Sequence, residues 1–104
     1  MKIQINAGDV QMSDAIRSHI NERINQGLNR FADRITRVEV HLKDENAKKG
    51  GADKRCTIEV RPANRQPMAV EEGHEDLYTA ITAAAHKAER AVAHLFERLD
   101  ERKT

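Results

Sequence analysis

The sequence contains few of the features that mark membrane, secreted or disulfide-bonded proteins. No apolar run approaches the about 18 residues that a membrane span needs, and residues 1–5 alternate in polarity where a signal peptide would be continuously apolar. Cys56 is the only cysteine among 104 residues, so it has no partner for an internal disulfide. We therefore expect no membrane anchor and a cytoplasmic, reducing environment.

Aromatic residues are also scarce. One tyrosine, two phenylalanines and no tryptophan are present, and none of them forms a pair along a predicted strand. Proteins that bind single-stranded RNA on a sheet stack bases on such pairs, so this mode of binding is disfavoured. A glycine-rich phosphate cradle is missing as well, because no strand–loop–helix pattern surrounds Gly50 and Gly51.

Residues for catalysis or metal binding occur without a recognisable spacing. The five histidines are scattered through the chain, whereas a zinc site needs three or four convergent ligands. Cys56 falls on the inward face of a predicted strand, where a thiol is usually inert. We expect no enzyme activity, metal, cofactor or small-molecule substrate. A histidine metal site and a Cys–His nucleophile are the alternatives that a structure can test. The histidines are His19, His41, His74, His86 and His94.

The charges that are present nearly cancel but are unevenly distributed. Eighteen basic and seventeen acidic residues give a net charge of +1. Residues 43–65 contain seven basic and four acidic residues, while residues 66–89 contain only one basic residue, Lys87, and five acidic ones. A polyanion would therefore have to bind a local basic patch.

Two helices follow from apolar residues spaced three and four apart. Ile16, Ile20, Ile24, Leu28 and Phe31 predict a helix over about 14–31, with Ser13 as its N-cap. A longer apolar stripe, with no helix-breaking residue, predicts a second helix between residues 74 and 102. At about 1.5 Å per residue it would be longer than a strand, so its last turns should project or fray over about 100–104. The clustered acids at 71–76 are expected to lead into this helix.

Four strands follow from alternating polarity, and together with the helices they define the fold. The strands are centred on Ile3 and Ile5, on Val38 and Val40, on Cys56 and Ile58, and on Met68 and Val70, the last being short. Residues 44–53 are predicted to form a polar loop. The order β-α-β-β-β-α predicts one α+β domain over 1–104, with two helices on one face of a four-stranded mixed sheet. The opposite face should be polar, with Lys2, Gln4, Glu39, His41, Lys43, Thr57, Glu59 and Arg61.

Basic residues gather on and beside the predicted helices. Arg17, Arg23 and Arg30 lie on the first helix, with Arg34 and Arg37 just after it, and Lys87 and Arg90 share a face of the second. Further cations, Lys48, Lys49, Lys54 and Arg55, lie in and beside the central loop. A phosphate backbone needs distributed cations more than a motif. The pattern therefore favours recognition of folded RNA by its shape and its phosphates.

Several ordered segments resemble the ribosome hibernation-promoting factor family, also called ribosome-associated inhibitor A or protein Y, in its short form. Residues 69–81, AVEEGHEDLYTAI, resemble the acidic lead-in and the Asp-Met-Tyr-Ala-Ala-Ile element of that family. Residues 87–90, KAER, are similar to the Lys-Leu-Glu-Arg that follows in the family. The strand at 3–5, the helix entry at 13–16 and the strand at 35–42 extend the resemblance over nearly the whole chain. Residues 91–97 depart from the family, which usually has several basic residues there.

The resemblance implies the same β-α-β-β-β-α fold and a non-enzymatic function. It implies binding to 16S rRNA of the small ribosomal subunit, where messenger and transfer RNA pass, so that idle ribosomes are silenced or preserved under stress or in stationary phase. The expected RNA-binding residues are Arg23, Arg30, Arg34, Arg37, Lys87, Arg90 and His94. An alternative is a divergent member that binds a protein or self-associates weakly through its last helix, by an apolar stripe of Val92, Leu95, Phe96 and Leu99.

Overall fold

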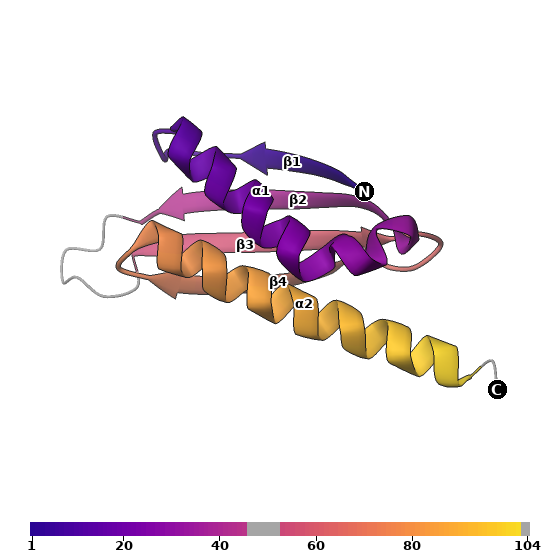
Figure 1. Ribbon diagram of the computed structural model, residues 1–104. Coiled ribbons are helices and arrows are strands. Elements are labelled where there is room, and N and C mark those ends of the chain that lie inside the picture. Colours follow the sequence, from indigo (N-terminus) through magenta and orange to yellow (C-terminus); the bar gives the residue numbers. More distant parts are fainter. Residues whose placement is uncertain (46–52, 103–104) are drawn as a thin grey trace.

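The chain folds as the predicted β-α-β-β-β-α sequence of elements. A computed structural model describes residues 1–45 and 53–102 (Figure 1). Most of the predicted loop, with Lys48, Lys49, Gly50 and Gly51, lies outside these residues. The elements are β1 (Lys2–Asn6), α1 (Asp14–Leu28), the 3-10 helix η1 (Asn29–Arg34), β2 (Ile35–Asp44), β3 (Lys54–Pro62), β4 (Met68–His74) and α2 (Leu77–Glu101).

The four strands form one mixed sheet in the order β1-β2-β3-β4. β1 runs parallel to β2, with Ile3 opposite Val38, and the other neighbours are antiparallel. Both helices cover one face of this sheet (Figure 1), which confirms the predicted architecture. The last turns of α2 extend beyond the strands, as its length predicted.

Hydrogen-bonding side chains fix the start of each helix. The Ser13 hydroxyl accepts a hydrogen bond from the Ile16 amide at 3.1 Å, which confirms the predicted cap. Asp76 caps α2, because its carboxylate accepts from the Thr79 amide at 3.0 Å and from the Thr79 hydroxyl at 2.8 Å. These hydrogen bonds favour the charged form and lower the pKa of Asp76 below its usual value.

Two predicted boundaries were wrong. The first α-helix ends at Leu28 and continues as η1 to Arg34, so Phe31 belongs to a tighter turn. Glu71 and Glu72 do not lead into α2 but lie in β4, which pairs with β3 as far as His74. The ladder hydrogen bonds of β4 outweigh the favourable placement of acids before a helix, since each bond satisfies a backbone group. Only Asp76, of the four acids, acts on the helix end.

The core lies between the sheet and the two helices. Ile20 and Ile24 of α1, Val38 and Ile58 of the central strands, and Ile81 of α2 are almost completely buried. Small residues on α2, including Ala80, Ala84, Ala85 and Ala88, are buried in the same layer. They allow α2 to approach the sheet and α1 closely, so that the polar surface of both helices faces outward.

Candidate nucleic-acid interface

The seven predicted RNA-binding residues fall in three separate places. Lys87, Arg90 and His94 are exposed on the side of α2 that faces away from α1, and we call them the α2 basic flank. A second group borders the seam between α1 and α2 and consists of Arg23, Arg30 and Arg34. Arg37 lies apart from both groups, in β2. The structure therefore does not form one continuous basic surface from all seven.

The α2 basic flank is the most accessible of the three groups. Its residues follow one another at intervals of three and four, so they share one side of the helix. The Lys87 ammonium donates to the Glu71 backbone carbonyl at 3.4 Å, which places it beside the edge strand β4. This contact leaves the charge of Lys87 without an acidic partner among the described residues, so it can still attract an anion.

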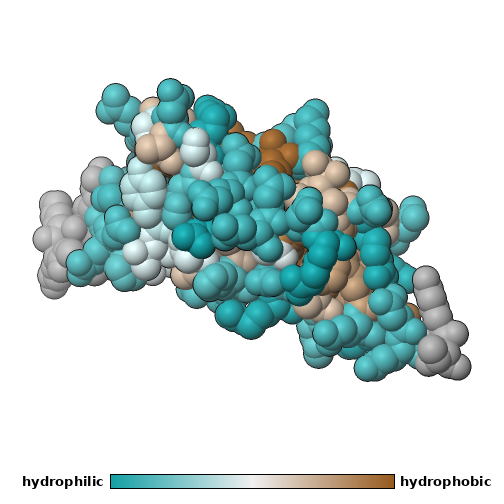
Figure 2. Space-filling view, viewed as in Figure 1, coloured by the Kyte–Doolittle hydropathy of each residue, from teal (hydrophilic) through white to brown (hydrophobic). Residues whose placement is uncertain are grey.

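Two of the three seam arginines are neutralised within the fold. Arg30 forms an ion pair with Glu89 at 2.7 Å, and Arg34 makes two hydrogen bonds to Asp100, at 3.1 and 3.3 Å. Arg23 donates to Gln26 at 3.2 Å, while its Nε atom is buried without a partner. Figure 2 shows a mainly hydrophilic surface over the two helices. Its positive character is weaker than the count of arginines suggests.

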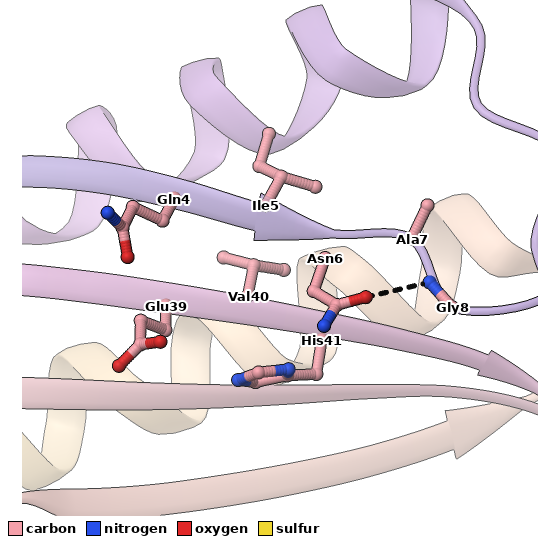
Figure 3. A pocket seen from close by; sticks show the side chains of 8 residues that line it. All are labelled: Gln4, Ile5, Asn6, Ala7, Gly8, Glu39, Val40 and His41. Atoms are coloured by element: carbon pink, nitrogen blue, oxygen red, sulfur yellow. Dashed lines mark hydrogen bonds between the residues drawn. The ribbon is translucent and has the colours of Figure 1, made fainter.

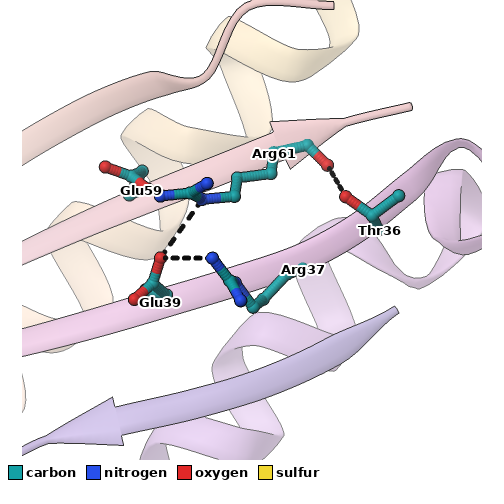
Figure 4. Close-up of polar contacts among 5 residues, drawn as sticks. All are labelled: Thr36, Arg37, Glu39, Glu59 and Arg61. Atoms are coloured by element: carbon teal, nitrogen blue, oxygen red, sulfur yellow. Dashed lines mark hydrogen bonds and ion pairs between the residues drawn. The ribbon is translucent and has the colours of Figure 1, made fainter. Parts of the chain in front are cut away.

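Arg37 lies on the open face of the sheet, opposite the helices. It follows a register shift between Ile35 and Arg37 in the pairing of β2 with β3, precedes the buried Val38, and binds Glu39 at 3.4 Å. Glu39 also contacts Arg61 at 3.2 Å, and Arg61 contacts Glu59 at 2.8 Å (Figure 4). This network of balanced charges confirms the predicted polar sheet face. Arg37 belongs to the network and therefore lies on the opposite side of the sheet from the helix arginines.

The open face also bears a broad hollow between β1 and β2. It has a volume of about 530 Å³, and its polar lining includes Gln4, Asn6, Glu39 and His41 (Figure 3). The Asn6 side chain accepts a hydrogen bond from the Gly8 amide at 3.0 Å, which stabilises the turn after β1. The lining contains no hydroxyl or thiol nucleophile beside His41, so it lacks the pairing that covalent catalysis requires.

Cys56 and the possible metal ligands were the other residues considered for catalysis or metal binding. Cys56 is completely buried, and burial raises the pKa of its thiol to about 12. The thiolate is therefore scarce at neutral pH. Within residues 1–45 and 53–102, no three His, Cys, Asp or Glu side chains are placed to hold a metal ion. Neither described helix has the apolar length required to cross a membrane.

The apolar stripe expected on α2 is mostly internal, which corrects its interpretation as a self-association surface. Val92 and Phe96 are buried, and Leu95 and Leu99 pack partly against the core. The reason is η1, which brings Phe31 to 5.4 Å from Phe96, measured between ring centroids. Tyr78 is the one large hydrophobic side chain that is exposed among the described residues.

The fold thus combines a polar helix layer that carries an exposed basic flank with a sheet whose open face bears balanced charge. A structure of a ribosomal subunit interface protein from Coxiella burnetii has the same fold, with a TM-score of 0.78 at 18% identity over 93% of this chain and 99% of that one.

The family is established by sequence. Residues 3–100 match the family described as Sigma 54 modulation protein / S30EA ribosomal protein, and the chain belongs to that family of ribosome-associated factors. It is 31% identical over 102 residues to a ribosome hibernation promoting factor of Azotobacter vinelandii, covering 98% of this chain and 89% of that protein. The N-terminal domain of Thermus thermophilus Protein Y gives a TM-score of 0.76 at 26% identity, over 91% of this chain and 99% of that one.

On this side of α2 the structure adds Arg98, a cation that sequence reasoning missed. Arg98 follows His94 by four residues and is exposed on the same side of α2. The sequence feature that could have identified Arg98 is the spacing of three and four residues that also links Lys87 to Arg90 and His94. It can be recognised because α2 continues as a regular helix to Glu101.

Proposed function

We propose that this chain binds 16S rRNA of the small ribosomal subunit in the cytoplasm, and thereby silences or preserves idle ribosomes under stress or in stationary phase. The observation that carries the proposal is the exposed α2 basic flank on a member of a ribosome-associated family. Cations in this arrangement can contact successive phosphates without reading the base sequence. No covalent step is needed, so the protein acts by occupancy and not by catalysis.

The predicted residues should contribute unequally to RNA binding, because some of them are already paired with acidic residues in the fold. Lys87 and Arg90 have no acidic partner among the described residues and provide the main attraction. Arg30 contributes less because its charge is shared with Glu89, and Arg34 is held by Asp100 in the same way. Arg37, on the opposite face, is left outside the proposed interface. The interface is thus narrower than the sequence suggested.

Charge reversal tests the assigned surface. The Lys87→Glu/Arg90→Glu variant should lose co-sedimentation with purified small subunits, and the binding of the unmodified chain should weaken steeply as salt rises. Lys2→Glu/Lys43→Glu is the matched control, because it changes net charge equally at two exposed residues of the open sheet face. Equal loss in both variants would show only a net-charge effect. No loss in the first would remove the α2 basic flank from the interface.

Silencing needs a separate measurement. Adding the chain to a translation extract should reduce peptide synthesis in proportion to the small subunits it occupies, and the Lys87→Glu/Arg90→Glu variant should not. Binding without any reduction would leave a ribosome-bound protein that does not silence. In that case survival of ribosomes during starvation, with and without the chain, would decide whether preservation is its function.

A further inference from the structure

Three arginines converge at the end of α2 on the side that faces the β3–β4 turn. Arg98 and Arg102 lie one helical turn apart, and Arg65 comes from the turn between the strands. Together with Leu95 and Leu99 they line a hollow of about 220 Å³. We call this hollow the arginine pocket. It is built from two elements that are distant in sequence.

The arginine pocket lacks an internal counter-charge. Arg30 and Arg34 each have a carboxylate partner, whereas Arg65, Arg98 and Arg102 have none among the residues that the structure describes. Like charges brought together repel one another unless an anion lies between them. The chain has a net charge of only +1, so this cluster is a local concentration of positive charge and does not reflect a generally basic surface.

The interaction of cations with the helix dipole explains the positions of only two of the three arginines. Cations at the end of a helix interact favourably with its dipole, which accounts for Arg98 and Arg102. It does not account for Arg65, which is held in a tight turn after Asn64, whose φ is 61°. The Arg65 amide donates to the Pro62 carbonyl at 3.4 Å in the same turn. This turn places Arg65 at the hollow independently of the helix.

We propose that the arginine pocket binds a phosphodiester group of the RNA backbone, as a second contact beyond the α2 basic flank. Guanidinium groups offer paired donors that match phosphate oxygens, while Leu95 and Leu99 provide an apolar base for the adjoining sugar. Arg98 lies about 16 Å along the helix from Lys87. At 3.4 Å per residue of a stacked strand, this distance corresponds to about five nucleotides.

The inference rests on the proposed function, since it names a further contact to the same class of partner. One RNA strand could run along α2 from Lys87 to the arginine pocket. The flank would then supply the first phosphate contacts and the pocket would hold the strand at the far end. Binding should depend on both, and each should contribute separately to the salt dependence.

Arginine side-chain NMR tests the arginine pocket directly. Adding a short oligouridine to the full chain should shift the Nε–Hε signals of Arg65, Arg98 and Arg102 to saturation, and should leave that of Arg17, an exposed arginine of α1, nearly unchanged. Inorganic phosphate alone should shift them only weakly. If all four arginines shift alike, or if an acidic peptide shifts the pocket signals as much as RNA does, the assignment to RNA is overturned.

Variants connect the arginine pocket to the ribosome. Arg65→Gln/Arg98→Gln should lower the salt slope of small-subunit binding by about 1, because the single phosphate contact that these arginines share is lost, while Arg17→Gln leaves it unchanged. Arg98→Lys should retain only part of the binding, because a point charge remains but the paired donors of the guanidinium group are lost. Unchanged binding of the double variant would overturn the pocket and leave the proposed function intact. A chain that never binds small subunits, but whose pocket still responds to RNA, would overturn only the function.

Discussion

The guanidinium group of Arg34 lies over the ring of Phe96, with 4.0 Å between its carbon and the ring centroid. The same guanidinium binds the Asp100 carboxylate. The contact therefore closes η1 against the C-terminal half of α2 by a cation–π interaction and an ion pair. The helix end extends beyond the strands as expected, but this contact packs its apolar side against η1.

Removing the Phe96 ring should destabilise the domain strongly. Phe96 is 4% exposed, and truncating a buried phenylalanine to alanine costs about 3 to 5 kcal/mol. Phe96→Ala should lower the free energy of unfolding in urea by that amount and uncover Leu95 and Leu99. Phe96→Leu is the control, with a smaller loss. Equal, small losses in both variants would mean that the end of α2 adds little to stability.

Neutralising Glu89 should strengthen ribosome binding. Glu89 holds Arg30 at 2.7 Å, so Glu89→Gln releases that cation toward an approaching phosphate. We expect tighter small-subunit binding and a salt slope larger by about 1. Glu59→Gln removes an equal charge from the open sheet face and should have little effect. An equal gain in both variants would indicate a general charge effect instead of a released Arg30.

Two glycines should respond in opposite ways to alanine. A Cβ on Gly27 would lie 3.5 Å from the Glu89 Cβ atom, an ordinary contact, so Gly27→Ala should stabilise α1 by up to about 1 kcal/mol. A Cβ on Gly8 would lie 2.7 Å from the Leu42 carbonyl oxygen, at a φ of +58°, so Gly8→Ala should destabilise by about 1 to 3 kcal/mol. Thermal unfolding of both variants measures the difference. A destabilising Gly27→Ala would mean that α1 and α2 cannot accept the added methyl group.

The cap of α2 should make stability depend on acid. The pKa of Asp76 is lowered in the folded state by its hydrogen bonds to Thr79, so its charge stabilises the fold above the unfolded pKa, near 3.8. This stabilisation is lost as the pH falls through the lower, folded pKa. Asp76→Asn keeps the cap oxygen without the charge. The stability difference between the two chains, followed by urea unfolding, should be constant near neutral pH and shrink below about pH 4.

Local patterns predicted the fold well because each element has one apolar face. The i+4 spacing of Ile16, Ile20 and Ile24, and the alternation of Val38 with Val40, correspond to buried positions. Boundaries were less predictable where tertiary contacts decide them. The turn at η1 depends on Phe31 meeting Phe96, and β4 extends through Glu72 because β3 provides a hydrogen-bonding partner.

The candidate interface was less predictable than the fold. Sequence spacing identified Lys87, Arg90 and His94 as neighbours, because they lie on one regular helix. It could not indicate that Glu89 neutralises Arg30, since the two residues lie on different helices and meet only after folding. Arg65 was missed for the same reason, because its place beside α2 depends on the turn between two strands.

The parallel pairing of β1 with β2 has a consequence for how this chain is made. Lys2 lies opposite Arg37, and Asn6 opposite His41, so β1 leaves the synthesising ribosome well before its partner β2 exists. β2, β3 and β4 follow one another directly along the chain and can pair in the order of their synthesis. During translation β1 is synthesised before β2, β3 and β4, and it can pair only after β2 has been made, so it docks on a sheet that is already under assembly.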